Sequence, residues 1–153
     1  MKIAVLLDTH NLLRPEVIEI IKSSNAVIHG GDINSQGVLD EIKSVMKPNA
    51  QLFVIRGNND KEWAENLSVS LDFELGGLKF FLTHNRKDIP QDIKADIIIF
   101  GHSHKYCEEN IGGQLWLNPG SCGRKRFNLP ITMAVMNVND NEYSIEKIEL
   151  EGE

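Results

Sequence analysis

The sequence contains no long hydrophobic run. Apolar side chains make up 41% of its 153 residues, yet no stretch approaches the roughly 20 apolar residues that a membrane-spanning helix needs. The opening MKIAVLLDTH has an apolar run of only five residues before Asp8, which is too short for the apolar region of a signal peptide. We therefore expect a cytoplasmic protein with no membrane partner.

Cysteine is scarce, since Cys107 and Cys122 are the only two in the chain and do not form a CxxC pair. We expect both to be reduced thiols, as is usual in the cytoplasm. Small packed side chains are a simpler interpretation of these cysteines than metal ligands.

Positive charge is also in deficit, with 16 Lys and Arg against 22 Asp and Glu and a net charge of -6. This balance does not favour specific nucleic-acid binding or attraction to an anionic membrane. An anionic substrate must then be bound locally, by metal ions or by a few basic groups. The length fits one domain over residues 1–153 that is large enough to form a hydrophobic core.

Alternating strand and helix patterns fill the first part of the chain. Buried strands are predicted at 2–8, 25–32 and 51–58, and helices with apolar residues at helical spacing are predicted at 14–24 and 36–46. This order of elements favours a parallel sheet with right-handed crossover connections.

Hairpins dominate the second part. Glycine pairs divide 69–84 and 105–118 into strand pairs, a buried strand is predicted at 96–102, and a last hairpin joins 131–138 to 143–150. Mixed sheets with few helices predict an α/β (α+β) fold in which two packed sheets are flanked by helices.

Side chains with oxygen or nitrogen donors follow five of the predicted buried strands. The carboxyl ends of strands are where ligands bind in open α/β sheets. Four of the five histidines in the chain belong to this set, and His29 is left as either a core residue or a hydrogen-bonding neighbour of the site. The donors are Asp8, His10, Asp32, Asn58, His84, His102 and His104.

The spacing of these donors indicates a metal site. Residues i and i+2 of an extended segment point to the same side, so Asp8 with His10, and His102 with His104, can each face one point. If Asp32 bridges, the seven residues supply eight contacts, four for each of two divalent ions.

Taken singly, such residues have simpler explanations. An isolated histidine is usually a packed core residue, and an isolated aspartate is usually a turn or helix cap. Five coincident strand ends favour the metal site, because buried unpaired carboxylates and imidazoles are costly. Donors that are all nitrogen or oxygen suit Mn²⁺, Ni²⁺, Co²⁺, Fe or Zn²⁺, and we expect Mn²⁺.

The complete set of motifs resembles the calcineurin-like metallophosphoesterases. NPGS at 118–121 and the short length are similar to the small YfcE-type branch of bacteria and archaea. The motifs that carry the resemblance are DTH at 8–10, GD at 31–32, GNND at 57–60, His84 and GHSH at 101–104.

This resemblance implies a four-layer αββα sandwich and a metal-dependent phosphoesterase, most often a phosphodiesterase, with a small phosphate ester as substrate. A hydroxide activated by two metal ions would attack phosphorus in line, with Asp32, Asn58 and His84 as catalytic residues. The implied ligands are Asp8, His10, Asp32 and His104 for one metal, and Asp32, Asn58, His84 and His102 for the other.

Two departures from the family pattern concern substrate binding. Asn59 stands where many relatives have a histidine that protonates the leaving group, and an amide cannot be a general acid at neutral pH. Arg86 replaces a second histidine after His84, and either binds the substrate phosphate or is a solvated surface residue. We predict substrate-binding roles for Asn59 and Arg86, and we expect Asp60 to orient neighbouring groups.

Further expectations concern the surroundings of the site, the alternative functions and the oligomeric state. Asn118 and Ser121 are expected to shape a turn near the site, and the basic cluster Arg124–Arg126 either attracts phosphate or is an exposed loop. A non-catalytic metal-binding scaffold of the same fold, as in a subunit of the retromer coat, is the alternative function, and a phosphomonoesterase is a third. A homo-oligomer is also compatible with the family.

Overall fold

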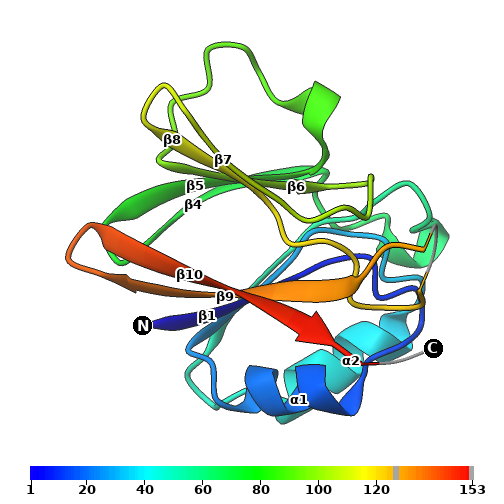
Figure 1. Ribbon diagram of the computed structural model, residues 1–153. Coiled ribbons are helices and arrows are strands. Elements are labelled where there is room, and N and C mark those ends of the chain that lie inside the picture. Colours follow the sequence, from blue (N-terminus) through cyan, green and yellow to red (C-terminus); the bar gives the residue numbers. More distant parts are fainter. Residues whose placement is uncertain (126–127, 152–153) are drawn as a thin grey trace.

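Two five-stranded sheets face each other in the computed structural model, which describes residues 1–125 and 128–151 (Figure 1). Sheet A has the strand order β10-β9-β1-β2-β3, and sheet B has the order β4-β5-β6-β8-β7. Sheet A contains β1 (Lys2–Leu6), β2 (Ala26–His29), β3 (Gln51–Val54), β9 (Ile131–Asn139) and β10 (Glu142–Leu150). Sheet B contains β4 (Ser70–Leu75), β5 (Leu78–Asn85), β6 (Ile97–Gly101), β7 (Cys107–Ile111) and β8 (Gln114–Asn118).

Both sheets are mixed. Strands β1, β2 and β3 run parallel, whereas β9 pairs antiparallel with β1 and with β10. In sheet B, β5, β6 and β8 are parallel, and β4 and β7 are antiparallel edge strands. The predicted parallel core with hairpins at its edges is therefore confirmed.

Two apolar cores lie between the layers, one between the two sheets and one between sheet A and the helices. Strand β1 contributes alternate residues to each core. Ile3 and Val5 pack between the two sheets, among side chains of β5, β6 and β8. Ala4 and Leu6 point to the opposite face of sheet A, where they meet the helices. This alternation follows from the two-residue period of a strand, and burial on both faces explains why β1 is a continuous apolar run.

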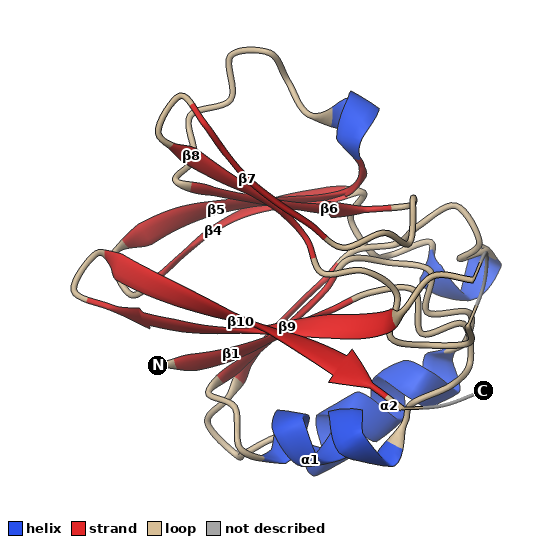
Figure 2. Ribbon diagram, in the orientation of Figure 1, coloured by secondary structure: helices blue, strands red, loops and turns tan. Residues whose placement is uncertain are grey.

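The helices are few, as expected. The two α-helices, α1 (Pro15–Lys22) and α2 (Gln36–Val45), lie against sheet A (Figure 2). Pro15 occupies the first turn of α1, where its missing N–H costs nothing. The part of the chain that the structure describes also has two one-turn 3-10 helices, η1 (Glu62–Ala64) and η2 (Arg86–Asp88), and η2 lies on the outer side of sheet B (Figure 2).

The strands of the parallel core end earlier than the sequence pattern predicts. The strand predicted at 25–32 ends at His29, and the one predicted at 51–58 ends at Val54. Gly31 and Asp32 have φ angles of 103° and 57°, which are incompatible with a strand. The polar residues at these ends therefore lie on loops that leave the sheet. Within the described residues, no helix is long and apolar enough to cross a membrane.

Candidate metal centre

The loops that leave the carboxyl ends of the parallel strands gather at one end of the sandwich (Figure 1, right). They bring together five of the seven predicted ligands in two overlapping groups. Within each group, one ligand atom from every residue lies within 4.8 Å of the others. The groups are Asp8, His10 and His104, and Asp8, Asp32 and His84.

Distances within the groups are those of side chains that converge on common points. Asp8 Oδ1 lies 4.0 Å from His10 Nε2 and 4.0 Å from His84 Nε2, and Asp8 Oδ2 lies 3.6 Å from His104 Nε2. Asp32 Oδ2 lies 3.1 Å from His84 Nε2. All five side chains are buried, with Asp8 fully inaccessible to solvent. Two buried carboxylates this close to each other are stable only when cations or protons offset their charge.

Backbone strain is concentrated at the same residues. Non-glycine residues rarely adopt the left-handed region, which costs roughly 1–2 kcal/mol each. Such outliers cluster at functional sites, where they aim side chains that a regular strand would point elsewhere. Positive φ angles occur at Asp8 (56°), His10 (46°), Asp32 (57°), His102 (75°) and His104 (62°).

Asp60 organises the loop that carries Asp32, as expected. Its carboxylate is buried and accepts backbone N–H groups from Asp32 at 2.8 Å, Ile33 at 2.9 Å, Asn34 at 2.8 Å and Gly57 at 2.9 Å. These four hydrogen bonds join the turn after β2 to the turn after β3. Asp60 thus fixes the position of two predicted metal-binding loops.

The Asp32 carboxylate is held from the neighbouring loop. Asn59 donates its backbone N–H to Asp32 Oδ1 at 2.8 Å and its side-chain Nδ2 to Oδ2 at 3.3 Å. Gly57 allows this approach, because a Cβ there would clash with Asp32 Oδ1. Although burial opposes ionisation, hydrogen bonds from His84 and Asn59 hold the pKa of Asp32 well below its usual range.

His84 is oriented by a backbone carbonyl. Its Nδ1 donates to Gly30 O at 2.8 Å, which directs Nε2 toward Asp32. Burial opposes the charged imidazole, but Asp32 and the Gly30 carbonyl outweigh it and raise the pKa of His84 to about 9. The electrostatics that favours a proton between Nε2 and Asp32 equally favours a divalent cation at that position.

His29 supports the site without joining it. Its Nδ1 accepts the Gly31 N–H at 3.1 Å, so Nε2 carries the proton and donates it to Thr9 Oγ1 at 3.1 Å. Burial and the neighbouring His84 lower the pKa of His29 to about 3, which keeps the ring neutral. This pair ties the DTH loop to the turn after β2, and Thr9 is a supporting residue that the sequence reasoning missed.

The NPGS turn, which follows β8, contacts the loops of the site, as expected for Asn118 and Ser121. Asn118 Oδ1 accepts the Gly120 N–H at 2.9 Å, and its Nδ2 donates to Ser103 Oγ at 3.1 Å. Ser121 Oγ donates to the carbonyl oxygen of Asp8 at 3.1 Å. In the adjoining basic cluster, Arg124 and Lys125 are exposed, and Arg126 lies outside the described residues.

The remaining two predicted ligands lie at the mouth of the centre. His102 is exposed, and its ring centroid is 5.6 Å from that of His84. Asn58 is exposed and lines a cavity that His84 also lines. Asp8 is common to the two groups of donors, whereas the sequence pattern placed Asp32 between the metals. The bridging role of Asp32 stays a prediction.

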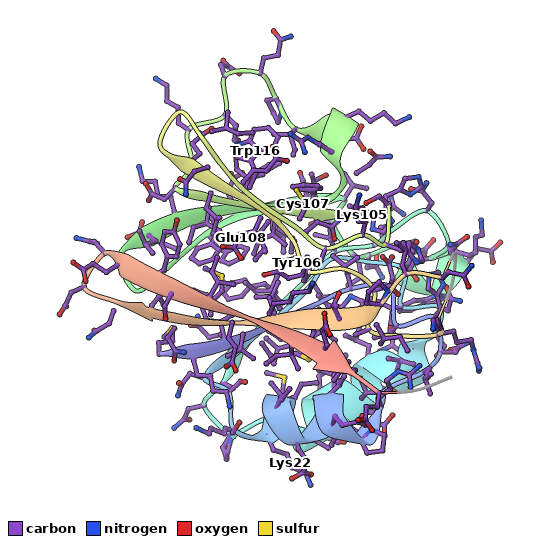
Figure 3. The ribbon with its side chains drawn as sticks, viewed as in Figure 1. Lys22, Lys105, Tyr106, Cys107, Glu108 and Trp116 are labelled. Atoms are coloured by element: carbon purple, nitrogen blue, oxygen red, sulfur yellow. The ribbon has the colours of Figure 1, made fainter. Side chains whose placement is uncertain are left out.

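The substrate-binding role of Arg86 stays a prediction, and the structure shows what its side chain contacts. Its guanidinium lies over the rings of Phe100 and Trp116, with Cζ 5.3 Å and 5.1 Å from the centroids, and Nη1 donates to Glu109 at 2.9 Å. Trp116 belongs to sheet B, on the opposite side of the molecule from Lys22 at the end of α1 (Figure 3). Arg86 therefore holds η2 against sheet B, and its bond to Glu109 uses one of the five N–H groups of the guanidinium.

The donor set fits a pair of divalent cations. The clustered ligand atoms are carboxylate oxygens and imidazole nitrogens, without thiolate, which is a set that Mn²⁺, Fe, Co²⁺, Ni²⁺ and Zn²⁺ accept. Both cysteines are free thiols, and Cys122, the one nearer in sequence to the NPGS turn, donates to the Leu7 carbonyl oxygen at 3.6 Å. Neither cysteine belongs to a clustered donor group among the described residues.

Comparisons with known proteins agree with this geometry. Residues 1–141 match the calcineurin-like phosphoesterase superfamily domain. A phosphodiesterase of Methanocaldococcus jannaschii is 32% identical over an aligned length of 165 residues, and the alignment covers 94% of this chain and 96% of that protein. The structure of an archaeal phosphodiesterase superposes with a TM-score of 0.78 at 28% identity, and covers 98% of this chain and 100% of its own.

The Escherichia coli phosphoesterase YfcE shares the fold, with a TM-score of 0.73 at 20% identity over 99% of this chain and 100% of its own. Fold, paired Asp and His groups, and matches over nearly the whole length lead to one conclusion. This chain belongs to the calcineurin-like phosphoesterase superfamily.

Proposed function

We propose that the protein is a metal-dependent phosphodiesterase whose cofactor is a pair of divalent cations, with Mn²⁺ as the expected ion. The observation that carries the proposal is the pair of buried Asp and His groups that share Asp8. Two cations at these groups would lower the pKa of a water molecule and offset the charge that develops on a phosphate ester. We place the reaction in the cytoplasm, where the free thiols Cys107 and Cys122 would stay reduced.

The chain itself supplies rigid positioning. Asp60 and Asn59 hold the loop and the carboxylate of Asp32, and the Gly30 carbonyl holds the ring of His84. These contacts keep the charged groups in place before substrate arrives, so little reorganisation is needed during the reaction. Asp32, Asn58 and His84 are the proposed catalytic residues on this basis.

Asn59 is the proposed substrate contact at the exposed mouth. Its Nδ2 already bonds Asp32 at 3.3 Å, and an amide with two N–H groups can donate the second to a phosphate oxygen. Because the amide cannot release a proton at neutral pH, the leaving group receives no proton from Asn59. The rate should therefore depend steeply on the pKa of the leaving alcohol.

Hydrolysis of bis(p-nitrophenyl) phosphate with added Mn²⁺ tests the proposal. Asp32→Asn and His84→Gln should each lower kcat/KM by at least about a hundredfold, since each removes a group at the centre. Asp92→Asn, an isosteric change on the exposed loop after η2, should retain the wild-type rate. Equal rates in all four proteins would contradict catalysis at this centre and would favour a scaffold.

The choice of ester decides the reaction class. A higher kcat/KM for bis(p-nitrophenyl) phosphate than for p-nitrophenyl phosphate would support a phosphodiesterase, and the reverse order would indicate a phosphomonoesterase.

The role of Asn59 is tested by a substitution. Asn59→His should raise the rate mainly for esters with poorly acidic alcohols, because the imidazole supplies the missing proton. An equal effect on all leaving groups would contradict the role given to Asn59.

A further inference from the structure

A cavity of about 290 Å³ opens directly beside the predicted second metal position. Asn58 and His84 form one part of its wall, so a molecule in the cavity would adjoin the reacting phosphate. Its other walls come from the turn after β3, the residue before β4, the end of β5 and η2. The lining residues are Arg56, Gly57, Asn58, Asp60, Val69, Thr83, His84 and Asp88.

The charged side chains in this wall differ in whether they form polar contacts within the described residues. The Asp60 carboxylate accepts hydrogen bonds from four backbone N–H groups. By contrast, across residues 1–125 and 128–151, no hydrogen bond or ion pair engages the Arg56 guanidinium or the Asp88 carboxylate. The chain thus presents one donor group and one acceptor group of opposite charge to the same cavity.

The segments that carry these two side chains are anchored. The Arg56 backbone N–H donates to Ser68 O at 3.0 Å, and Arg56 directly precedes the GNND turn that Asp60 fixes. Asp88 ends η2, which Arg86 holds against sheet B through Glu109. Anchored walls fit a preformed binding pocket.

We propose that this cavity binds the organic substituent of the phosphate ester, and that Arg56 and Asp88 select substituents with hydroxyl groups, the class of nucleosides and sugars. The inference rests on the proposed phosphoesterase function. A hydroxyl both donates and accepts a hydrogen bond, so the hydroxyl groups of one substituent can donate to Asp88 and accept from Arg56. The opposite charges cancel, which disfavours a second phosphate group.

Size and polarity narrow the class further. A volume of about 290 Å³ lies just below the range of small-molecule sites, which run from about 300 to 1,000 Å³. That space suits one nucleoside-sized unit. Val69 is the one large apolar side chain among the lining residues and is 59% exposed, so the wall offers little to a lipid chain.

Two chromogenic diesters with the same leaving group test the inference. With Mn²⁺, the kcat/KM ratio of thymidine 5′-p-nitrophenyl phosphate to methyl p-nitrophenyl phosphate should be at least about ten, because a hydrogen bond to a charged group contributes about that factor. Arg56→Met and Asp88→Asn should each lower this ratio about tenfold. Lys87→Met, beside Asp88 on η2 but outside the cavity wall, is the matched control and should keep the wild-type ratio.

A binding measurement separates this inference from the proposed function. Calorimetry with Mn²⁺ should show tighter binding of thymidine 5′-monophosphate than of methyl phosphate, with the difference lost in both variants. Selective binding without hydrolysis of either ester would retain the pocket and reject the phosphodiesterase. Hydrolysis of both esters with equal efficiency, or equal binding of both phosphates, would overturn the pocket. So would variants that lower the rates of both esters alike.

Discussion

Replacing Asp60 with asparagine should destabilise the protein by about 4 kcal/mol, although Asp60 is not a predicted metal ligand. The two carboxylate oxygens accept four backbone N–H groups at 2.8, 2.9, 2.8 and 2.9 Å. In Asp60→Asn one oxygen becomes an NH₂ group, so two N–H groups lose their acceptor and face a donor instead. Each buried donor left unsatisfied costs roughly 1–3 kcal/mol.

Urea unfolding in the absence of divalent ions measures this cost. For a small protein, the dependence of the unfolding free energy on urea is about 1–3 kcal/mol per molar, so the midpoint should fall by at least about 1 M. Asp96→Asn is the matched control, because Asp96 is exposed and accepts one backbone N–H, from Lys79 at 2.8 Å. Its loss should cost about 1 kcal/mol or less.

The same substitution should weaken metal binding, since Asp60 holds the loop that carries Asp32. Calorimetric titration with Mn²⁺ should show a lower affinity for Asp60→Asn than for Asp96→Asn. If both variants lost equal amounts of stability and bound Mn²⁺ as well as the wild type, the loops would not depend on this carboxylate and the reasoning would be refuted.

Three further predictions address residues around the centre. Arg86→Met should leave kcat/KM for bis(p-nitrophenyl) phosphate within about twofold of the wild type if its contacts are only structural, whereas a tenfold loss would support the predicted substrate-binding role. Unfolding free energy should fall as pH drops from about 6.5 to 4, because unfolded His29 takes up a proton that the folded ring, with a pKa of about 3, does not. This effect is worth about 3 kcal/mol, and a His29→Asn variant with a parallel pH profile would disprove it. At pH 8.5, iodoacetamide should modify Cys107 faster than Cys122, because Cys107 is partly exposed whereas Cys122 is fully buried and burial raises the pKa of its thiol to about 12; peptide mass spectrometry showing equal rates would contradict this.

The location of the centre was predictable because it depends on local sequence. Buried parallel strands leave their carboxyl ends at one edge, and Asp8 and Asp32 each follow such a strand. His104 joins Asp8 because β1 and β6 lie in facing sheets whose inner residues pack together. Hydrophobic patterning was enough for that arrangement.

A supporting role was predicted for Asp60 and Ser121, but the partners of these residues were not predictable, because the contacts join segments distant in sequence. Asp60 meets the Asp32 turn across 28 positions, and Ser121 meets Asp8 across 113. Arg86 looked like a phosphate ligand because it follows His84 so closely. Its actual partners, Phe100 and Trp116, lie on the outer face of sheet B, and only the course of the chain after β5 decides between the two.

The central claim, that two divalent cations occupy this centre, is tested most directly by anomalous diffraction from crystals grown with Mn²⁺. We expect two anomalous peaks, one beside Asp8, His10 and His104 and one beside Asp32 and His84, about 3.5–4 Å apart. A map with no peak among these five side chains, or with a single peak at full occupancy, would contradict the dinuclear centre.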